Sequence, residues 1–382
     1  MEKMKVQSSC QNRGRAYTTS APAANLKERS LAAMKKKITL LFGGESSEHT
    51  VSCKSAKTII DNIDPVKYDL TLIGITTDGK WLRFCGDTAL IPTDQWASSP
   101  QAAPVFFSLG GKKKGLFVMD NCVEEPIETD LFFPVLHGKY GEDGTIQGLF
   151  EMMGIPYVGC GVAASANAMD KSTTKLLVDS IGVKQARYIA IDRWNTNDLD
   201  GIVRECIEKL GFPMFVKPCA SGSSIGITKA TDETSLCAGI ALALEHDTRV
   251  LVEEFIHVRE LECAVIDDGK NLYAEVGEVI AADEFYDFDA KYNNAASVTN
   301  THPDIPTELE ERIKESAKAI FRVLNCRSLS RVDFFLDRDT GDLIFNEINT
   351  LPGFTNISMY PMLAAKHGLD LSALIDTLIE SV

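Results

Sequence analysis

The chain has 382 residues, of which 45% are hydrophobic and 24% are charged. This length suggests two or three domains, and the hydrophobic share is large enough for full cores, which excludes disorder for most of the chain. Lys and Arg total 39 against 54 Asp and Glu, and the net charge of −15 argues against non-specific binding to DNA or RNA. No apolar run reaches the roughly 18 to 20 residues that a membrane helix needs, so we expect a soluble chain.

The ten cysteines are scattered singly, without any C-x-x-C pair. This excludes the usual spacing of zinc and redox motifs. We therefore expect free, mostly buried thiols in a reducing compartment, and a cytoplasmic protein.

Residues 1–33 differ from the rest, with six basic and two acidic residues, many Ser, Thr and Ala, and little periodicity. An acid-poor segment of this kind can be an organelle transit peptide. An extended or mis-chosen start is the simpler interpretation, because a clean strand pattern follows Met34 at once. We treat residues 1–33 as a disordered leader outside the fold.

The next part of the chain alternates strand and helix patterns. Strands are expected at ITLLFGG (38–44), YDLTLIGIT (68–76) and TDLFFPVLHG (129–138), with a helix at 50–63. Such alternation is typical of βαβ units on a parallel sheet, whose ligands bind at the carboxyl ends of the strands. The loops at 43–49 and 137–144 therefore point to one crevice. We place an N-terminal α/β substrate domain at residues 34–158.

Around residue 158 the pattern becomes α+β. Helices are expected at about 170–181, 198–210 and 307–325 and in the C-terminal tail, with strands that include FPMFVKP, GITKA, RVLVEEFI, LECAVID, NLYAEVGEVI, RVDFFLD and LIFNEIN. We place a central domain at 159–254 and a C-terminal catalytic domain at 255–382.

The loop SGSSIG (221–226) lies between two of these strands. Glycine and serine let the backbone turn tightly and present N–H groups to an anion. Because the Gly-Lys-Ser/Thr and helix of a P-loop do not follow, we predict a hairpin flap over phosphates, with Lys217 as a nearby point charge. An ordinary Gly-Ser turn is the alternative.

Asp333, Glu347 and Asn349 lie on two strand patterns joined by the turn DRDTG. Residues i and i+2 of a strand share a face, so Glu347 and Asn349 point together and a hairpin partner can bring Asp333 beside them. Two carboxylates and an amide oxygen suit a Mg²⁺ ion that also holds nucleotide phosphates. A solvent-facing polar stripe is the alternative, which the apolar residues around them disfavour.

Other residues occupy positions suited to a substrate. Arg331 shares the face of Asp333 and can stabilise a developing oxyanion or form an ordinary salt bridge. Gly353 offers a backbone N–H in a Pro-Gly turn, and Glu48 can bind an ammonium group or complement a helix dipole. His137 ends a strand, where a histidine is commonly a structural group. The segment FYDFDAKYN (285–293) suggests a loop that closes over a site.

Together these strings resemble the D-alanine–D-alanine ligases of the ATP-grasp superfamily. The matching strings span residues 42–358 in the family's order: GGESSEHTVS, HGKYGEDGTIQG, MDKSTTK, FVKPCASGSSIGI, EFYDFDAKY, SRVDFFL and FNEINTLPGFTNIS. The resemblance implies a three-domain ATP-grasp fold, with ATP between two antiparallel sheets. It also implies ATP-dependent joining of two D-alanines through an acyl phosphate for peptidoglycan synthesis, two Mg²⁺ (or Mn²⁺) ions and a homodimer.

The resemblance further implies roles for individual residues. The ATP contacts it implies are Lys171 and Lys217 at the phosphates, Ser224 in the Gly-Ser loop, Glu253 at the adenine, Glu260 at the ribose and Lys291 near the transferred phosphate. The metal ligands are Asp333, Glu347 and Asn349. For the first D-alanine, Glu48 binds the ammonium group, with Ser223 and Tyr292 as its partners. Arg331 and the Gly353 N–H hold the oxyanion. His137 contacts substrate, and Ser358 binds the carboxylate of the second D-alanine.

The second substrate is the open point of the resemblance. Relatives that accept D-lactate carry Phe where Tyr292 stands, which favours an amine nucleophile here. The closing loop and HGKYGEDG also resemble vancomycin-resistance ligases that add D-serine, and a D-alanine–D-serine ligase is the alternative function. Those relatives tend to carry arginine just after the serine that matches Ser358. Met359 stands there in this chain and offers a serine hydroxyl no hydrogen bond, so we predict D-alanine.

Hypotheses from two other classes make different predictions for these residues. A non-catalytic ATP-binding module predicts loss of residues among Asp333, Glu347, Asn349 or Arg331, and all four are present. A different ATP-grasp enzyme is disfavoured by the set of Glu48, Ser223 and Tyr292.

Overall fold

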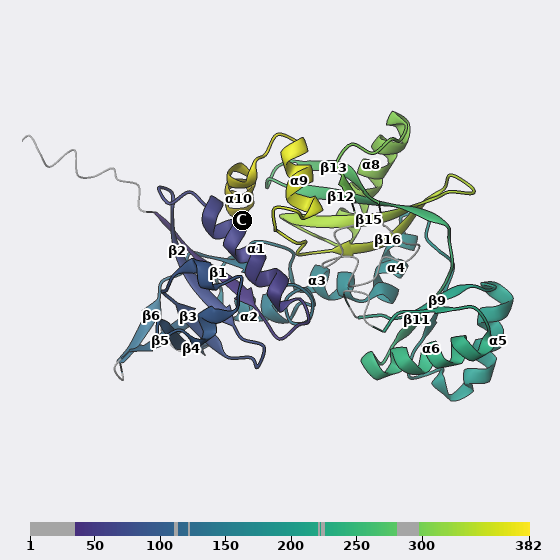
Figure 1. Cartoon of the computed structure of the whole chain (residues 1–382), viewed down its shortest axis with the longest axis horizontal. Helices are drawn as coiled ribbons and strands as arrows, with labels where there is room; N and C mark the ends of the chain where they lie inside the picture. Colours follow the sequence, from purple (N-terminus) through teal and green to yellow (C-terminus); the bar gives the residue numbers. More distant parts are fainter. Residues whose placement is uncertain (1–34, 111–113, 121–122, 221, 223–225, 281–297) are drawn as a thin grey trace, which may run out of the picture. The chain divides into compact units, whose positions relative to one another are not determined.

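The structure is a computed structural model that describes residues 35–110, 114–120, 123–220, 222, 226–280 and 298–382 (Figure 1). Residues from Lys36 to Val382 form one compact unit. The leader predicted at residues 1–33 lies outside the described residues, as does the predicted closing loop at 285–293.

Seven strands form the first sheet, in the order β6-β5-β4-β3-β2-β1-β7. β1 (Lys36–Gly43) pairs in parallel with β2 (Tyr68–Ile75) and β7 (Leu131–Val135), and α1 (His49–Asn62) joins β1 to β2. This arrangement confirms the predicted parallel α/β unit. The antiparallel strands β3 (Trp81–Phe84), β4 (Ala102–Ser108), β5 (Gly115–Asp120) and β6 (Val123–Ile127) extend the sheet and were not predicted.

Four antiparallel strands form the second sheet, in the order β10-β9-β11-β8. They are β8 (Tyr188–Ile191), β9 (Met214–Pro218), β10 (Thr228–Ala230) and β11 (Val250–Glu254), and α5 (Leu199–Lys209) and α6 (Glu233–His246) pack against them (Figure 1). The Gly-Ser loop connects the hydrogen-bonded strands β9 and β10, so the predicted hairpin is present. α2 (Thr145–Met153), α3 (Val162–Met169) and α4 (Lys171–Asp179) precede this sheet.

The third sheet has five strands in the order β14-β13-β12-β15-β16. They are β12 (Val258–Asp267), β13 (Leu272–Ile280), β14 (Val298–Asn300), β15 (Leu329–Asp337) and β16 (Leu343–Asn349). α8 (Thr307–Val323) covers one face, because its Ile313 and Phe321 pack against apolar side chains such as Leu261 and Phe334. Side-chain alternation then directs Glu262 and Asp333 to the opposite face.

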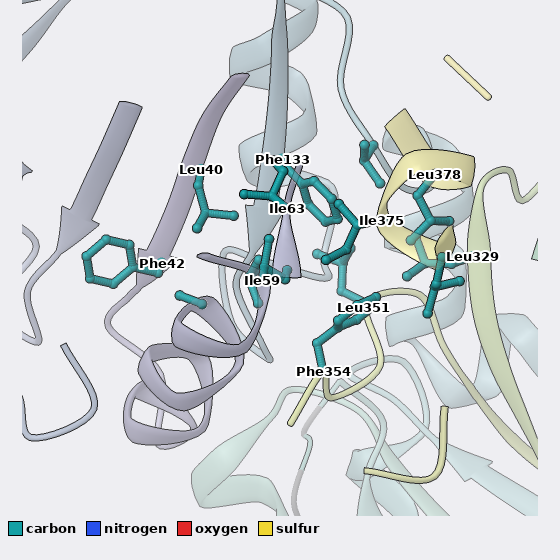
Figure 2. Packing of buried hydrophobic residues seen from close by; sticks show 14 of the residues in the cluster. Leu40, Phe42, Ile59, Ile63, Phe133, Leu329, Leu351, Phe354, Ile375 and Leu378 are labelled. Carbon is teal, nitrogen blue, oxygen red and sulfur yellow. The ribbon is translucent and has the colours of Figure 1, made fainter. Parts of the chain in front are cut away.

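The largest core joins the first sheet to the C-terminal part of the chain. Ile59 of α1, Ile63 just after this helix and Phe133 of β7 lie in one buried cluster with Phe354 and Ile375 (Figure 2). The last two helices are α9 (Met359–Lys366) and α10 (Leu371–Glu380). Full burial of each such side chain contributes about 1.5 to 3 kcal/mol, so this cluster holds the loop after β16 against α1 and β7.

The three sheets fall within the three predicted domain ranges, 34–158, 159–254 and 255–382. The boundaries themselves stay predictions. No helix in the described part of the chain is long and apolar enough to span a bilayer.

Candidate active site

A row of carboxylates crosses the third sheet. Asp333 of β15 lies opposite Glu347 of β16 and opposite Glu262 of β12 in the strand register. Directly opposed residues of antiparallel strands project from the same face, so these three side chains stand side by side. Asn349, two residues after Glu347, donates from Nδ2 to Asp333 Oδ2 at 3.0 Å. The structure thus brings together the three predicted metal ligands and adds Glu262, which was missed although it lies two residues after Glu260.

Arg331 is enclosed by this row. Its Nε and Nη2 donate to the two carboxylate oxygens of Asp333 at 2.8 and 2.7 Å, and its Nε lies 3.2 Å from Glu262 Oε2. Burial alone would lower the pKa of Arg331, but the carboxylates of Asp333 and Glu262 outweigh it and raise the pKa well above its usual value. The guanidinium is therefore permanently charged and held in one orientation.

The row fits a divalent cation by its donor chemistry. Glu262, Asp333 and Glu347 carry three negative charges, while Arg331 and Lys171, whose Nζ lies 3.5 Å from Glu347 Oε2, carry two positive charges. An ionised carboxylate has about four lone-pair sites, so Asp333 can accept the hydrogen bonds from Arg331 and still coordinate a cation. Asn349 uses its amide nitrogen toward Asp333, which leaves its oxygen as a hard donor of the kind that Mg²⁺ prefers.

A second charged group joins the second sheet to α4. Lys175 Nζ lies 2.7 Å from Glu253 Oε1, and Lys217 pairs with the other oxygen of the same carboxylate. All three side chains are buried. Burial alone would raise the pKa of Glu253, but the two ammonium groups lower it to about 2, so the carboxylate stays ionised. Burial, together with Lys217, lowers the pKa of Lys175.

Of the predicted ATP residues, the structure therefore brings Lys217 and Glu253 together. Lys175 was missed, although it lies one helical turn after Lys171, a spacing that places both on one face of α4. Glu260 lies on β12 two residues before Glu262 and so faces the same side of the sheet. Ser224 and Lys291 lie outside the described residues.

Glu48 lies where three loops meet. It precedes the first residue of α1, and its carboxylate is buried. A Cβ atom on Gly138 would lie only 2.8 Å from Glu48 Oε2, and one on Gly222 of the Gly-Ser loop would lie 3.6 Å from the same oxygen. The loops at 43–49 and 137–144 thus converge as predicted, and Gly222 reaches them. Ser223 and Tyr292, the predicted partners of Glu48, lie outside the described residues.

His137 contacts the loop that follows β16. Its Nδ1 lies 2.9 Å from the carbonyl oxygen of Leu351, and its Nε2 lies 3.3 Å from Ser55 Oγ. Burial lowers the pKa of His137, so the ring is neutral near pH 7. Because both ring nitrogens have protein partners, the geometry supports the structural role that the sequence left open, and the substrate contact stays a prediction.

Glu142 is a further, half-buried residue at this junction that sequence reasoning missed. Its carboxylate accepts hydrogen bonds from Gly138 N at 2.8 Å and from Leu351 N at 3.0 Å. Burial and the neighbouring charge of Glu48 raise the pKa of Glu142 to about 8.

Gly353 and Ser358 lie close to each other on the loop after β16, because a Cβ on Gly353 would meet Ser358 Oγ at 2.9 Å.

A separate cluster, His49, Cys53 and Asp94, places potential ligand atoms within 4.8 Å of one another among the described residues. The histidine already contacts Gly44 O at 2.8 Å and Asp94 Oδ1 at 3.0 Å through its two nitrogens. Burial raises the pKa of the Cys53 thiol to about 12, which opposes the thiolate that a metal needs. We interpret this cluster as a structural hydrogen-bond group.

Comparisons with known proteins identify the family models and relatives that this chain matches. The family models described as D-ala D-ala ligase N-terminus and D-ala D-ala ligase C-terminus match residues 37–160 and 177–380. A D-alanine–D-alanine ligase from Ruminiclostridium cellulolyticum is 45% identical over 91% of this chain and 95% of its own length. One from Acetivibrio thermocellus is 44% identical over the same shares of each chain.

Two solved structures are also similar to this chain. The crystal structure of the VanG D-Ala:D-Ser ligase from Enterococcus faecalis matches with a TM-score of 0.83 and 40% identity, over 91% of this chain and 100% of that chain. The D-alanine–D-alanine ligase from Coxiella burnetii matches with a TM-score of 0.79 and 31% identity, over 91% and 94%.

Proposed function

The chain belongs to the D-alanine–D-alanine ligase family, and we propose the roles that its side chains take in that family's reaction. It is an ATP-dependent ligase that joins two D-alanines to D-alanyl-D-alanine, a peptidoglycan precursor. The observation that carries the assignment of roles is the row of Glu262, Asp333 and Glu347 with Arg331 fixed inside it.

In the first step, we propose, Glu48 binds the ammonium group of the first D-alanine at the start of α1. The carboxylate of this D-alanine attacks the γ-phosphorus of ATP, which gives an acyl phosphate and ADP. Lys171 and Lys217 would neutralise the phosphate oxygens. Asp333, Glu347 and Asn349 would hold two Mg²⁺ (or Mn²⁺) ions, which supply charge neutralisation at the transferred phosphoryl group.

In the second step the amine of the second D-alanine, after loss of a proton, attacks the acyl carbonyl carbon. Arg331 and the Gly353 N–H stabilise the oxyanion of the tetrahedral intermediate, and phosphate leaves as the peptide bond forms. Ser358 would bind the carboxylate of the second D-alanine. Exclusion of water protects the acyl phosphate from hydrolysis, and we assign this to the predicted closing loop that carries Lys291 and Tyr292.

D-alanine is the second substrate that the site favours. Met359 begins α9 next to Ser358, is buried, and packs so closely on β13 that a Cβ on Gly277 would lie 2.6 Å from its sulfur. A thioether offers a serine hydroxyl no comparable hydrogen bond, a difference of about 1 to 3 kcal/mol. The similarity to the VanG D-Ala:D-Ser ligase keeps D-serine as the second candidate.

Competition between the two amino acids tests this choice. ADP release should depend on D-alanine and should not occur with L-alanine. With D-alanine and D-serine supplied together, mass spectrometry should find mainly D-alanyl-D-alanine. Predominant D-alanyl-D-serine would reverse the assignment, and no D-alanine-dependent ADP release would indicate an ATP-binding module without catalysis.

We also propose that the protein acts as a cytoplasmic homodimer. The scattered cysteines, eight of which are free among the described residues, fit a reducing compartment. Light scattering coupled to size-exclusion chromatography tests the dimer, and a monomeric mass at working concentration would refute it.

A further inference from the structure

Side chains from the N-terminal part of the chain hold the backbone of residues 351–354 at three points. Glu142 accepts from Leu351 N at 3.0 Å, His137 Nδ1 meets Leu351 O at 2.9 Å, and Ser55 Oγ accepts from Phe354 N at 3.1 Å. Ser55 is fully buried in α1 and also contacts His137 Nε2 at 3.3 Å. Ser55 and His137 are therefore connected, and Glu142 joins them by accepting from the N–H of Gly138, the residue after His137, at 2.8 Å.

The anchored segment leaves one N–H group for a ligand. Leu351 N and Phe354 N are used by the anchors, and proline at 352 has no N–H. The Gly353 N–H, which lies between them, donates to no other group in the described part of the chain. It is the group to which the proposed function assigns the oxyanion.

We infer that Ser55 and Glu142 are positioning residues for the Gly353 N–H, an inference that rests on the proposed function. An oxyanion donor acts through fixed geometry, and a misplacement of about 1 Å can cost about a hundredfold in rate. Ser55 fixes the C-terminal side of the Gly353 N–H through Phe354 N, and Glu142 fixes the other side through Leu351 N.

Helix α1 then positions two reacting groups at once. Glu48 directly precedes its first turn and Ser55 lies seven residues later, which is two turns and roughly 10 Å along the same helix face. Helix α1 therefore sets the position of both the ammonium site of the first D-alanine and the oxyanion donor. This arrangement explains why a buried serine on α1 bonds to a segment 299 residues away.

The test compares Ser55→Ala with Ser52→Ala in the full chain. Ser52 is a matched control because it is also fully buried in α1, but its Oγ accepts from Gly43 N and donates to Val135 O within the first sheet. Rapid-quench experiments measure ADP and dipeptide in the first turnover, steady-state kinetics separate the KM values of the two D-alanines, and thermal unfolding measures stability. Glu142→Gln perturbs the same segment from outside α1.

We expect Ser55→Ala and Glu142→Gln to form ADP in the first turnover within about twofold of the wild-type rate. Dipeptide formation should slow about tenfold or more, and acyl phosphate should accumulate and be trapped by hydroxylamine. The KM for the first D-alanine should stay unchanged. Ser52→Ala should lose stability without separating the two steps.

The inference fails if Ser55→Ala slows ADP and dipeptide formation equally. It fails as well if Ser52→Ala, at an equal loss of stability, also slows dipeptide formation but not ADP formation. It also fails if Ser55→Ala is as fast as wild type. Failure of the proposed function is distinct, because the wild-type chain would then release no ADP in response to D-alanine.

Discussion

The half-buried carboxyl group of Glu142 should make the stability of the protein fall as the pH rises. Glu142 accepts two backbone N–H groups. Burial, followed by the charge of Glu48, raises its pKa from 4.5 to about 8. The variant Glu142→Gln removes this titration but keeps an acceptor for only one of the two N–H groups, so the pH dependence of its difference from wild type, and not the difference at one pH, measures the titration.

The sign of this change in stability follows from which state of the protein binds the Glu142 proton. Below about pH 4.5 both the folded and the unfolded protein hold it, and above about pH 8 neither does. Between these values the folded protein binds a proton that the unfolded chain has released, so the free energy of unfolding decreases as pH rises. At about 1.4 kcal/mol for each pH unit, the full change is on the order of 5 kcal/mol.

Urea unfolding of wild type and Glu142→Gln between about pH 5 and about pH 9 measures this effect. As the pH rises, wild type should lose several kcal/mol of unfolding free energy relative to the variant. Infrared difference spectra should show a protonated carboxyl band near neutral pH that Glu142→Gln lacks. Glu151→Gln is the control, because Glu151 is exposed and should follow wild type.

Parallel pH profiles for wild type and Glu142→Gln would refute this reasoning. An ionised carboxylate band for Glu142 already at about pH 5 would refute it as well. Either result would mean that water or a cationic group stabilises the ionised carboxylate more than burial and the charge of Glu48 destabilise it.

Three further predictions follow from the charged groups. Arg331→Met should lower kcat about a hundredfold or more while ATP binding, measured by calorimetry, stays within a few fold; an unimpaired rate would remove the oxyanion role. Glu253→Gln should lose the stability that its pKa of about 2 provides; this contribution is present above the ordinary value of 4.5 and disappears toward pH 2, so wild type and variant should converge in acid unfolding. Met359→Arg should raise the share of D-alanyl-D-serine about tenfold in competition, and an unchanged product ratio would show that residue 359 does not select the second substrate.

Local patterns in the sequence predicted much of the third sheet and its carboxylates. Glu347 and Asn349 share a face because of the two-residue period of a strand, and a short turn brings Asp333 opposite Glu347. β15 and β16 are adjacent in the chain, so this pairing is local, although its register shifts between Asp333 and Phe334. Glu262 and Lys175 could have been found by the same rules, from Glu260 by the strand period and from Lys171 by the helix period.

Contacts between distant segments could not be predicted in this way. Glu142 and Leu351 are 209 residues apart, and Ser55 and Phe354 are 299 apart, so no periodicity relates them. The antiparallel strands β3 to β6 were missed for a different reason. β4 (AAPVFFS) contains Pro104 and β6 (VEEPI) contains Pro126, and a proline within a short run weakens the strand pattern.

The two proposed oxyanion donors are held by independent parts of the fold. Arg331 is fixed inside the third sheet by Asp333 of its own strand β15 and by Glu262 of the neighbouring strand β12. The Gly353 N–H depends on Ser55 and Glu142, which belong to α1 and the loop after β7. A small shift of α1 against the third sheet would therefore move the Gly353 N–H and leave Arg331 in place. Because both donors must meet one oxygen atom, the shared apolar core between α1 and the loop after β16 is itself a condition for the second step (Figure 2).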